Sequence, residues 1–188
     1  MYLVTHPDVV IDPNVPVPEW PLSVRGRVRM QQVLAQEWLR RVESVYSSLE
    51  RKARDGAEIV AAHLHKPYQA IAGLGEIDRS ATGYLPHDEH MAVAAEFFAH
   101  PDQSIRGWER AVDAQQRIVS TIDRLLAHDH GQGDIIIVSH GGVALLYRCW
   151  LKQQAISDKE PPPHPNGGNY YCFDAQTKQL VHDWRVID

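Results

Sequence analysis

The hydrophobic pattern of the chain alternates short apolar runs with longer segments whose apolar residues recur every three or four positions. Ile135-Ile136-Ile137-Val138 is the most apolar of these runs, and an unbroken apolar run is typical of a central strand covered on both faces. The short runs predict strands at 2–5, 43–47, 68–72, 134–139, 169–174 and 179–186. The periodic segments predict helices at 23–41, 50–63, 89–99, 107–128 and 141–154.

This alternation of strands and helices predicts an α/β sandwich with a largely parallel sheet. Residues 8–21 contain four prolines and are therefore predicted to form an irregular surface loop. The sequence has no internal repeat, low-complexity tract or long linker, so residues 1–188 are predicted to form a single domain. In such sheets, ligands bind beyond the carboxyl ends of the strands.

Composition narrows the classes of function. Of the 188 residues, 44% are apolar and 23% are charged, which is typical of a globular protein. The net charge of -5 and the absence of a basic run argue against nucleic-acid binding, so an anionic ligand would need a local cluster of positive groups. No apolar run is long enough to span a bilayer or to act as a signal peptide, which predicts no membrane contact and a cytoplasmic location. Cys149 and Cys172 are far apart and are expected to be ordinary thiols; the oligomeric state stays open.

Two histidines lie where a ligand is expected. His6 ends the first predicted strand, and His140 ends the strand 134–139 and precedes Gly141-Gly142. Glycines allow close approach of the backbone to a ligand, and the N-terminus of the following helix suits an anion such as phosphate. Either histidine alone is explained more simply as the residue that closes a strand, but the pair favours an anion site.

Five segments, in order along the chain, resemble the histidine phosphatase superfamily, the fold of the phosphoglycerate mutases. That family carries Arg-His-Gly after the first strand and Ser-His-Gly after a late strand, where this chain has Thr5-His6-Pro7 and Ser139-His140-Gly141. Residues 22–27 are similar to the family's Leu-Thr-x-x-Gly-Arg segment, and residues 45–58 to its Ser-x-Leu-x-Arg-Ala-x-x-Thr-Ala stretch. Leu74-Gly75-Glu76 matches the family's Leu-x-Glu. The resemblance implies a phosphoglycerate mutase-like, three-layer α/β/α sandwich with a mostly parallel central sheet.

The stretch at 45–58 can be matched in two registers. Without gaps, Lys52 takes the place of the family's phosphate-binding arginine, whereas a slip of one residue puts Arg51 there. The ungapped register is preferred because it also places Ala57 and Glu58 correctly. Lys52, Arg51 and Thr5 are therefore the candidate phosphate-binding residues.

The resemblance implies a metal-independent and cofactor-independent phosphoryl transfer. His6 would attack phosphorus and become a phosphohistidine, and His140 would donate to the phosphoryl oxygens. Glu76 would protonate the leaving oxygen and then activate water, with Asp78 as the rival acid. The implied enzyme is a phosphoric monoester hydrolase acting on a small phosphorylated metabolite; phosphoglycerate mutase-type transfer is a further alternative, less favoured because the chain is short.

The sequence departs from the family pattern at the positions that hold phosphate. Thr5 stands in place of the arginine before the nucleophile and Lys52 in place of the second arginine, so the pocket loses bidentate contacts. The alternative is therefore a weak or inactive member that binds a phosphorylated or anionic ligand. The phosphatase is favoured over the weak or inactive member if another arginine completes the pocket. The candidates near the motifs are Arg25, Arg27, Arg51, Arg54 and Arg79.

Two other features carry alternatives. His87 and His90, three residues apart with acidic residues between them, are compatible with zinc on a helix, but no third ligand is evident and no metal is predicted. Trp108 lies where family members often have a Gly-Glu-Ser segment that contributes to the site. It is either a functional residue or a packing anchor.

Overall fold

The computed structural model describes residues 1–188 and contains one mixed sheet of six strands, in the order β3-β2-β4-β1-β5-β6. The strands are β1 (Tyr2–Thr5), β2 (Val42–Ser47), β3 (Tyr68–Ala70), β4 (Asp134–Ser139), β5 (Asn169–Phe173) and β6 (Leu180–Val186). The first four strands of the chain run parallel, while β5 is antiparallel to both β1 and β6. β4 and β1 lie in the middle of the sheet, so the two strands that precede His140 and His6 are its most protected part.

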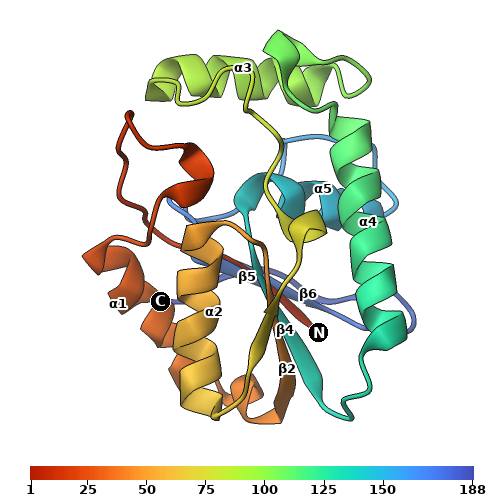
Figure 1. Ribbon diagram of the computed structural model, residues 1–188. Helices are drawn as coiled ribbons and strands as arrows, with labels where there is room; N and C mark the ends of the chain where they lie inside the picture. Colours follow the sequence, from red (N-terminus) through yellow and green to blue (C-terminus); the bar gives the residue numbers. More distant parts are fainter.

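Helices cover both faces of the sheet (Figure 1). They are α1 (Val24–Gln31), α2 (Arg51–Leu64), α3 (His87–Ala99), α4 (Ala111–His128) and α5 (Gly141–Leu151). Alternate residues of β4 point to opposite faces: Ile135 and Ile137 pack under α4 and α5, whereas Ile136 and Val138 pack under α1 and α2. These two apolar clusters confirm the predicted α/β/α sandwich with a mostly parallel sheet.

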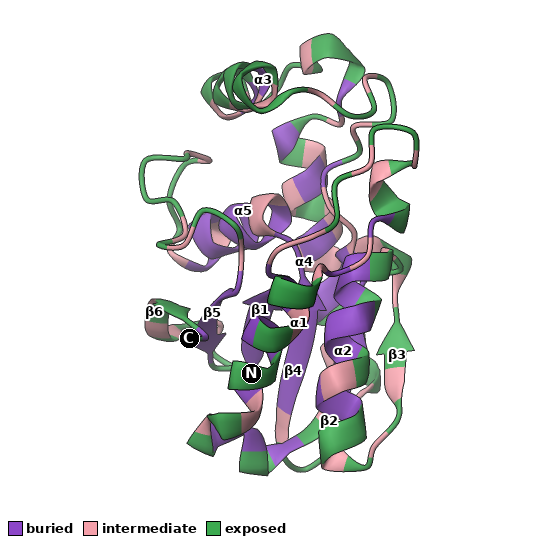
Figure 2. Cartoon of the chain, turned by 90° about the vertical axis from the view of Figure 1, so that its left-hand side faces the viewer, coloured by how far each residue is buried: buried purple, intermediate pink, exposed green.

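The third helix lies apart from this core. Figure 2 shows α3 beyond the carboxyl end of the sheet, with mostly exposed residues. Only Val93 and Phe97 of α3 are buried. The helix therefore overhangs the region in which the site is expected. No helix of the chain has the length and apolar character needed to cross a bilayer.

The predicted helix 23–41 is wrong in its second half. Ser23 caps α1 by accepting the Gly26 N–H at 3.0 Å, as its sequence position indicates. After Gln31, however, the chain forms two 3₁₀ turns, at Gln32–Ala35 and Glu37–Arg41, separated by an extended Gln36. The change of direction lets Trp38 stack on Tyr2 with ring centroids 3.9 Å apart, a long-range contact that helical spacing does not reveal.

Three other predicted boundaries shift for backbone reasons. The helix predicted from residue 107 begins at Ala111, because Arg106 and Gly107 have positive φ angles of 52° and 82°. The helix predicted to reach residue 154 ends at Leu151, since Gln153 also has a positive φ. Strand β3 ends at Ala70, two residues early, where the chain turns into a short 3₁₀ segment. Cys149 and Cys172 are both buried free thiols.

Candidate active site

The two histidines meet at the carboxyl edge of the sheet. Strands β1 and β4 pair in parallel with Thr5 opposite Ser139, so the residues that follow these strands lie side by side. The His6 N–H donates to the Ser139 carbonyl at 2.9 Å, which extends the ladder by one bond. The imidazole rings of His6 and His140 are 5.1 Å apart between centroids, in an edge-to-face arrangement.

The ring of His6 has a fixed tautomer. Its Nδ1 lies 2.9 Å from the Pro7 carbonyl oxygen, which can only accept, so Nδ1 carries the proton and Nε2 keeps its lone pair. Burial, reinforced by the nearby Lys52 ammonium, lowers the pKa of His6 to about 4. The ring is therefore neutral at pH 7, with Nε2 free to act as a nucleophile.

A cavity of about 530 Å³, here called the His6 cavity, opens beside this ring. Part of its wall is formed by Pro165, Asn166 and Gly167 of the segment 164–168, which packs against the backbone of His6. Gly167 has a φ of +71°, and a Cβ there would lie 1.9 Å from the His6 carbonyl oxygen, so only glycine fits. Arg29 holds the segment by donating to the Gly167 carbonyl at 3.1 Å and to Asp8 at 2.8 Å.

His140 is fully buried and is held from one side only. Its Nε2 lies 2.7 Å from the Ser48 hydroxyl oxygen and 3.3 Å from Glu50 Oε1. Its Nδ1 is buried and has no hydrogen-bond partner. Burial lowers the pKa of His140 to about 3, against the opposing effect of Glu50, so the unliganded ring is neutral.

Glu50 joins several of these groups. One carboxylate oxygen faces His140 and accepts the Glu76 N–H at 2.7 Å, and the other accepts from the Lys52 ammonium at 2.5 Å. Burial opposes ionisation of Glu50, but the facing His140 ring in its protonated form and the Lys52 ammonium lower the pKa of its carboxyl to about 2. Lys52 also donates to the Val17 carbonyl at 2.9 Å. The lysine is thus buried, charged and fixed beside the cavity.

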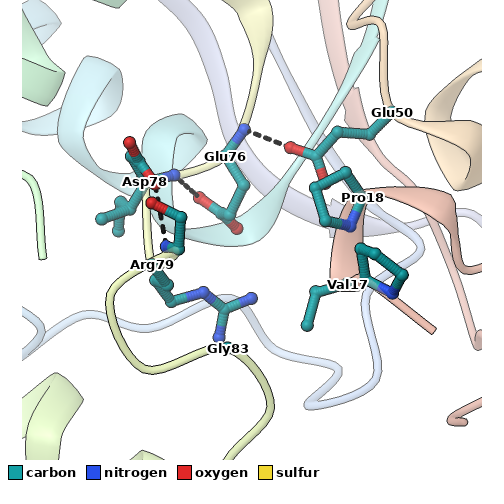
Figure 3. Close-up of a pocket in the computed structure, with 10 residues that line it drawn as sticks. Val17, Pro18, Glu50, Glu76, Asp78, Arg79 and Gly83 are labelled. Carbon is teal, nitrogen blue, oxygen red and sulfur yellow. Dashed lines mark hydrogen bonds between the residues drawn. The ribbon is translucent and has the colours of Figure 1, made fainter. Parts of the chain in front are cut away.

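Glu76 lies at the N-terminus of α5. Its carboxylate accepts the N–H groups of Ile77 at 3.0 Å, Gly142 at 3.1 Å and Val143 at 3.0 Å. A Cβ on Gly142 would lie 2.6 Å from Glu76 Oε1, so glycine permits the close approach. Figure 3 shows Glu76 beside Arg79, and it shows the hydrogen bond that the Glu76 backbone N–H donates to the Glu50 carboxylate.

A second cavity of about 540 Å³ adjoins the first. It is here called the Asp78 cavity, and it is lined by Asp78, Ser80 and Gly83 among others. Val17, Glu76 and Arg79 line both cavities. The two cavities are therefore neighbours that share these three residues as a common border.

The sequence matches the model of the histidine phosphatase superfamily (branch 1) over residues 15–182. The chain belongs to this superfamily. The matched region begins after His6, so the membership is established by the rest of the chain and the role of His6 depends on its geometry. The resemblance seen in the motifs is confirmed at the level of the superfamily.

Solved structures of other proteins share the fold of this superfamily member. A mycobacterial glucosyl-3-phosphoglycerate phosphatase in complex with inorganic phosphate is 17% identical, with a TM-score of 0.76 over 98% of this chain and 93% of its own. YhfR of Bacillus stearothermophilus is 22% identical, with a TM-score of 0.74 over 95% and 92%. A putative α-ribazole-5'-P phosphatase of Escherichia coli is 22% identical, with a TM-score of 0.70 over 98% and 93%. No curated protein matches the sequence.

The structure brings His6, His140, Glu76 and Lys52 together but leaves Thr5 and Arg51 outside the His6 cavity. The Thr5 hydroxyl is buried and accepts the Asn169 N–H at 3.0 Å, so it holds strand β5. Arg51 pairs with Asp55 at 2.8 Å, and its side chain is 54% exposed. Lys52, as the ungapped register predicts, is the residue of this pair that lines the cavity.

Among the five candidate arginines, Arg79 is the one that lines the His6 cavity. Its guanidinium lies over the Trp108 ring, 5.5 Å from the centroid, and 3.0 Å from His90 Nδ1. Trp108 is buried and donates to the Thr82 hydroxyl at 2.9 Å. The tryptophan therefore anchors the loop that carries Arg79 rather than lining the cavity itself.

Two further results concern residues outside the predicted set. Glu50 is missing from the sequence prediction, although it contacts His140, Lys52 and Glu76. Ser48 lies in the stretch 45–58 that resembles a family motif, but the sequence assigns it no role. No group of three or more His, Cys, Asp or Glu side chains is arranged to hold a metal ion; His90 of the His87/His90 pair contacts Arg79 instead.

Proposed function

We propose that this superfamily member is a phosphoric monoester hydrolase that acts through a phosphohistidine at His6 on a small phosphorylated metabolite. The observation that carries the proposal is the 2.9 Å contact between His6 Nδ1 and the Pro7 carbonyl, which leaves Nε2 unprotonated next to a cavity. A neutral imidazole with a fixed tautomer is the state in which histidine attacks phosphorus.

Two steps complete the reaction. In the first, His6 Nε2 forms a bond to phosphorus, the bond from phosphorus to the ester oxygen breaks, and Glu76 gives its proton to that oxygen. In the second, water attacks the phosphohistidine, Glu76 takes the proton of the water, and inorganic phosphate leaves as the bond to Nε2 breaks. His6 returns to its neutral form, so no metal or cofactor enters the balance.

Positive groups around the His6 cavity support binding of the phosphoryl group. Arg79 lines this cavity and forms no ion pair in the structure, and Lys52 of α2 lines the same cavity. The backbone of Gly141, at the N-terminus of α5, lines the same cavity, where the helix dipole favours an anion. A guanidinium on the loop 75–86 would thus replace the arginine that the family carries before the nucleophile.

Glu76 is a better acid–base candidate than Asp78. Glu76 lines both cavities, which places it where the ester oxygen would join them. Asp78 lines only the Asp78 cavity, and hydrogen bonds from Ser80 lower the pKa of its carboxyl. The preference for Glu76 therefore rests on its position, since its carboxylate accepts backbone N–H groups as well.

The membership of this chain in the histidine phosphatase superfamily supports phosphate as its ligand, and so do the ligands of similar structures. Among proteins of the same fold, the mycobacterial glucosyl-3-phosphoglycerate phosphatase has been solved with inorganic phosphate and with VO3. The adjoining Asp78 cavity of about 540 Å³ suits the organic part of a metabolite.

The test is hydrolysis of p-nitrophenyl phosphate and of an alkyl phosphate by the wild type, His6→Ala and Glu76→Gln. His6→Ala is expected to be inactive on both substrates and to form no acid-labile phosphoenzyme. Glu76→Gln is expected to lose on the order of 10²-fold or more on the alkyl ester but much less on the nitrophenyl ester, whose leaving group needs no proton. His63→Ala, an exposed histidine on α2, is the matched control. Equal activity of wild type and His6→Ala would refute the proposal.

A second candidate is a member that binds an anionic ligand without turnover. The observation that favours it is the engagement of Lys52 by Glu50 and by the Val17 carbonyl, which leaves the ammonium little capacity for phosphate. This candidate predicts phosphate binding with no phosphoenzyme, so the experiment above separates the two.

A further inference from the structure

Glu50 is the residue of the site whose presence neither the motif nor the proposed reaction explains. Its side chain is only 13% exposed and contacts three groups of the site: the His140 ring, the Lys52 ammonium and the Glu76 N–H. A buried carboxylate beside a phosphate site is costly unless its charge is used. The question is which step uses it.

The contacts of His140 give the answer. On one side, Nε2 faces Ser48 and Glu50; on the other, Nδ1 is buried without a partner. Few buried polar atoms of the chain lack a partner, and this nitrogen belongs to the ring that lies against His6, with centroids 5.1 Å apart. If a phosphoryl oxygen is its partner, Nδ1 must carry a proton while Nε2 keeps its own partners.

Ser48 can accommodate either protonation state of the ring. Its oxygen accepts the Glu50 N–H at 3.2 Å, so the hydroxyl proton is free to rotate. Toward a neutral Nε2 the hydroxyl donates; toward a protonated Nε2 its second lone pair accepts, and Glu50 Oε1 accepts as well. The same arrangement therefore serves a neutral and a protonated His140.

We infer that Glu50 is a positioning residue that fixes His140 and Lys52 and supplies the counter-charge with which His140 takes up a proton when a phosphoryl group binds. The inference rests on the proposed function and names how that site completes its positive charge. The proton comes from solvent and returns to solvent when phosphate leaves. The resulting imidazolium donates through Nδ1 to a phosphoryl oxygen and replaces one of the cations that the arginine positions of the family would provide.

Charges on every neighbouring element bear on this step. Lys52 on α2 and His6 after β1 oppose a charge on His140, whereas Glu50 and Glu76 favour it. Arg117 of α4 acts on Glu50 from the far side and forms its own ion pair with Glu109 at 2.8 Å. A bound phosphate dianion also favours a positive charge on His140. Together with Glu50 and Glu76 it outweighs the burial that keeps the ring neutral in the unliganded site.

Proton uptake during phosphate binding measures this step without turnover. Inorganic phosphate is titrated calorimetrically in buffers of different ionisation enthalpy at about pH 7.5, where phosphate is largely a dianion. The wild type and His6→Ala are both expected to take up a measurable fraction of a proton, because the acceptor is His140 rather than the nucleophile. Glu50→Gln is expected to bind phosphate on the order of tenfold more weakly, a loss of about 1.4 kcal/mol, with little proton uptake.

Two variants complete the design. Glu50→Asp keeps the charge and is expected to retain most of the uptake, whereas Glu58→Gln, an exposed carboxylate farther along α2, should behave as the wild type. Binding without uptake in the wild type, or Glu50→Gln binding phosphate as tightly as the wild type, would overturn the inference and leave the proposed function standing. Failure of the wild type to bind phosphate at all would overturn both.

Discussion

His6 and His140 follow neighbouring strands of the same sheet, yet their surroundings differ in almost every respect. His6 precedes a loop, lines a cavity and has its Nδ1 fixed by its own neighbour, Pro7. His140 precedes a helix, is fully buried and is fixed through Nε2 by Ser48 and Glu50. Equivalent positions in a sheet thus leave opposite ring nitrogens without a partner, Nε2 in His6 and Nδ1 in His140. The difference favours His6 as the residue that forms a bond and His140 as the residue that stabilises charge.

The largest expected effect that separates the two histidines is that of His140→Gln. Loss of one preorganised donor to the phosphoryl group should lower kcat by on the order of 10²–10³-fold. The phosphohistidine at His6 should still form, more slowly, and be detectable after an alkaline quench as a phosphoenzyme that is labile to acid. If His140→Gln abolishes the phosphoenzyme while His6→Ala does not, the two roles are reversed.

Arg79→Ala tests the guanidinium that lines the His6 cavity. Removing a charge-assisted hydrogen bond should raise KM by about 10–100-fold, with a smaller change in kcat. Arg79→Lys should recover part of the affinity, because a point charge replaces the guanidinium. Arg40→Ala, an exposed arginine distant from the cavities, is the control. An unchanged KM in Arg79→Ala would show that phosphate is held by other groups.

The buried ring of His140 should also affect stability. Burial lowers its pKa from 6.5 to about 3, so the unfolded chain binds a proton that the folded chain does not. Stability from this group is present at neutral pH and is lost as the pH falls below 6.5. At pH 5 the loss should be about 2 kcal/mol. Urea unfolding at both pH values should show a smaller pH dependence for His140→Gln than for the wild type; equal dependence would contradict the burial argument.

The smallest expected effect is a change in the titration of His6. The ring should titrate with a pKa of about 4 in nuclear magnetic resonance spectra, because of burial and of the Lys52 ammonium. Lys52→Met removes that ammonium and should move the midpoint upward, toward the ordinary range. Lys159→Met, which changes an exposed charge remote from the site, should leave it in place. A midpoint that does not move in Lys52→Met would show that burial alone sets the titration.

The sequence predicts the fold well where the pattern is local. Both ends of the strand 134–139 are predicted correctly, because its unbroken apolar run is typical of a central strand and is bounded by turn residues. The break at Gln36 depends on the stacking of Trp38 on Tyr2, a contact across distant parts of the chain, and no local spacing encodes it. The three displaced boundaries likewise involve positive φ angles or turns that propensity does not specify.

The candidate site divides in the same way. His6, His140 and Glu76 are located by motif and strand position, and the ungapped register identifies Lys52. Arg79 could not be chosen from five arginines, because its direction is set by Trp108 through the loop that the tryptophan holds. Glu50 is missed because its partners come from β4 and from the segment after β3, which only the folded sheet brings together.

The place of β1 in the sheet has a consequence for how the protein is made. This strand leaves the ribosome before the rest of the domain, yet both of its neighbours in the sheet, β4 and β5, come more than 120 residues later. β1 and the His6 that follows it therefore have no partner strand until most of the polypeptide has been synthesised. The candidate site is consequently one of the last parts of the molecule to form, and a nascent chain that stalls before residue 164 has its proposed nucleophile but not the wall of residues 164–168 that encloses it.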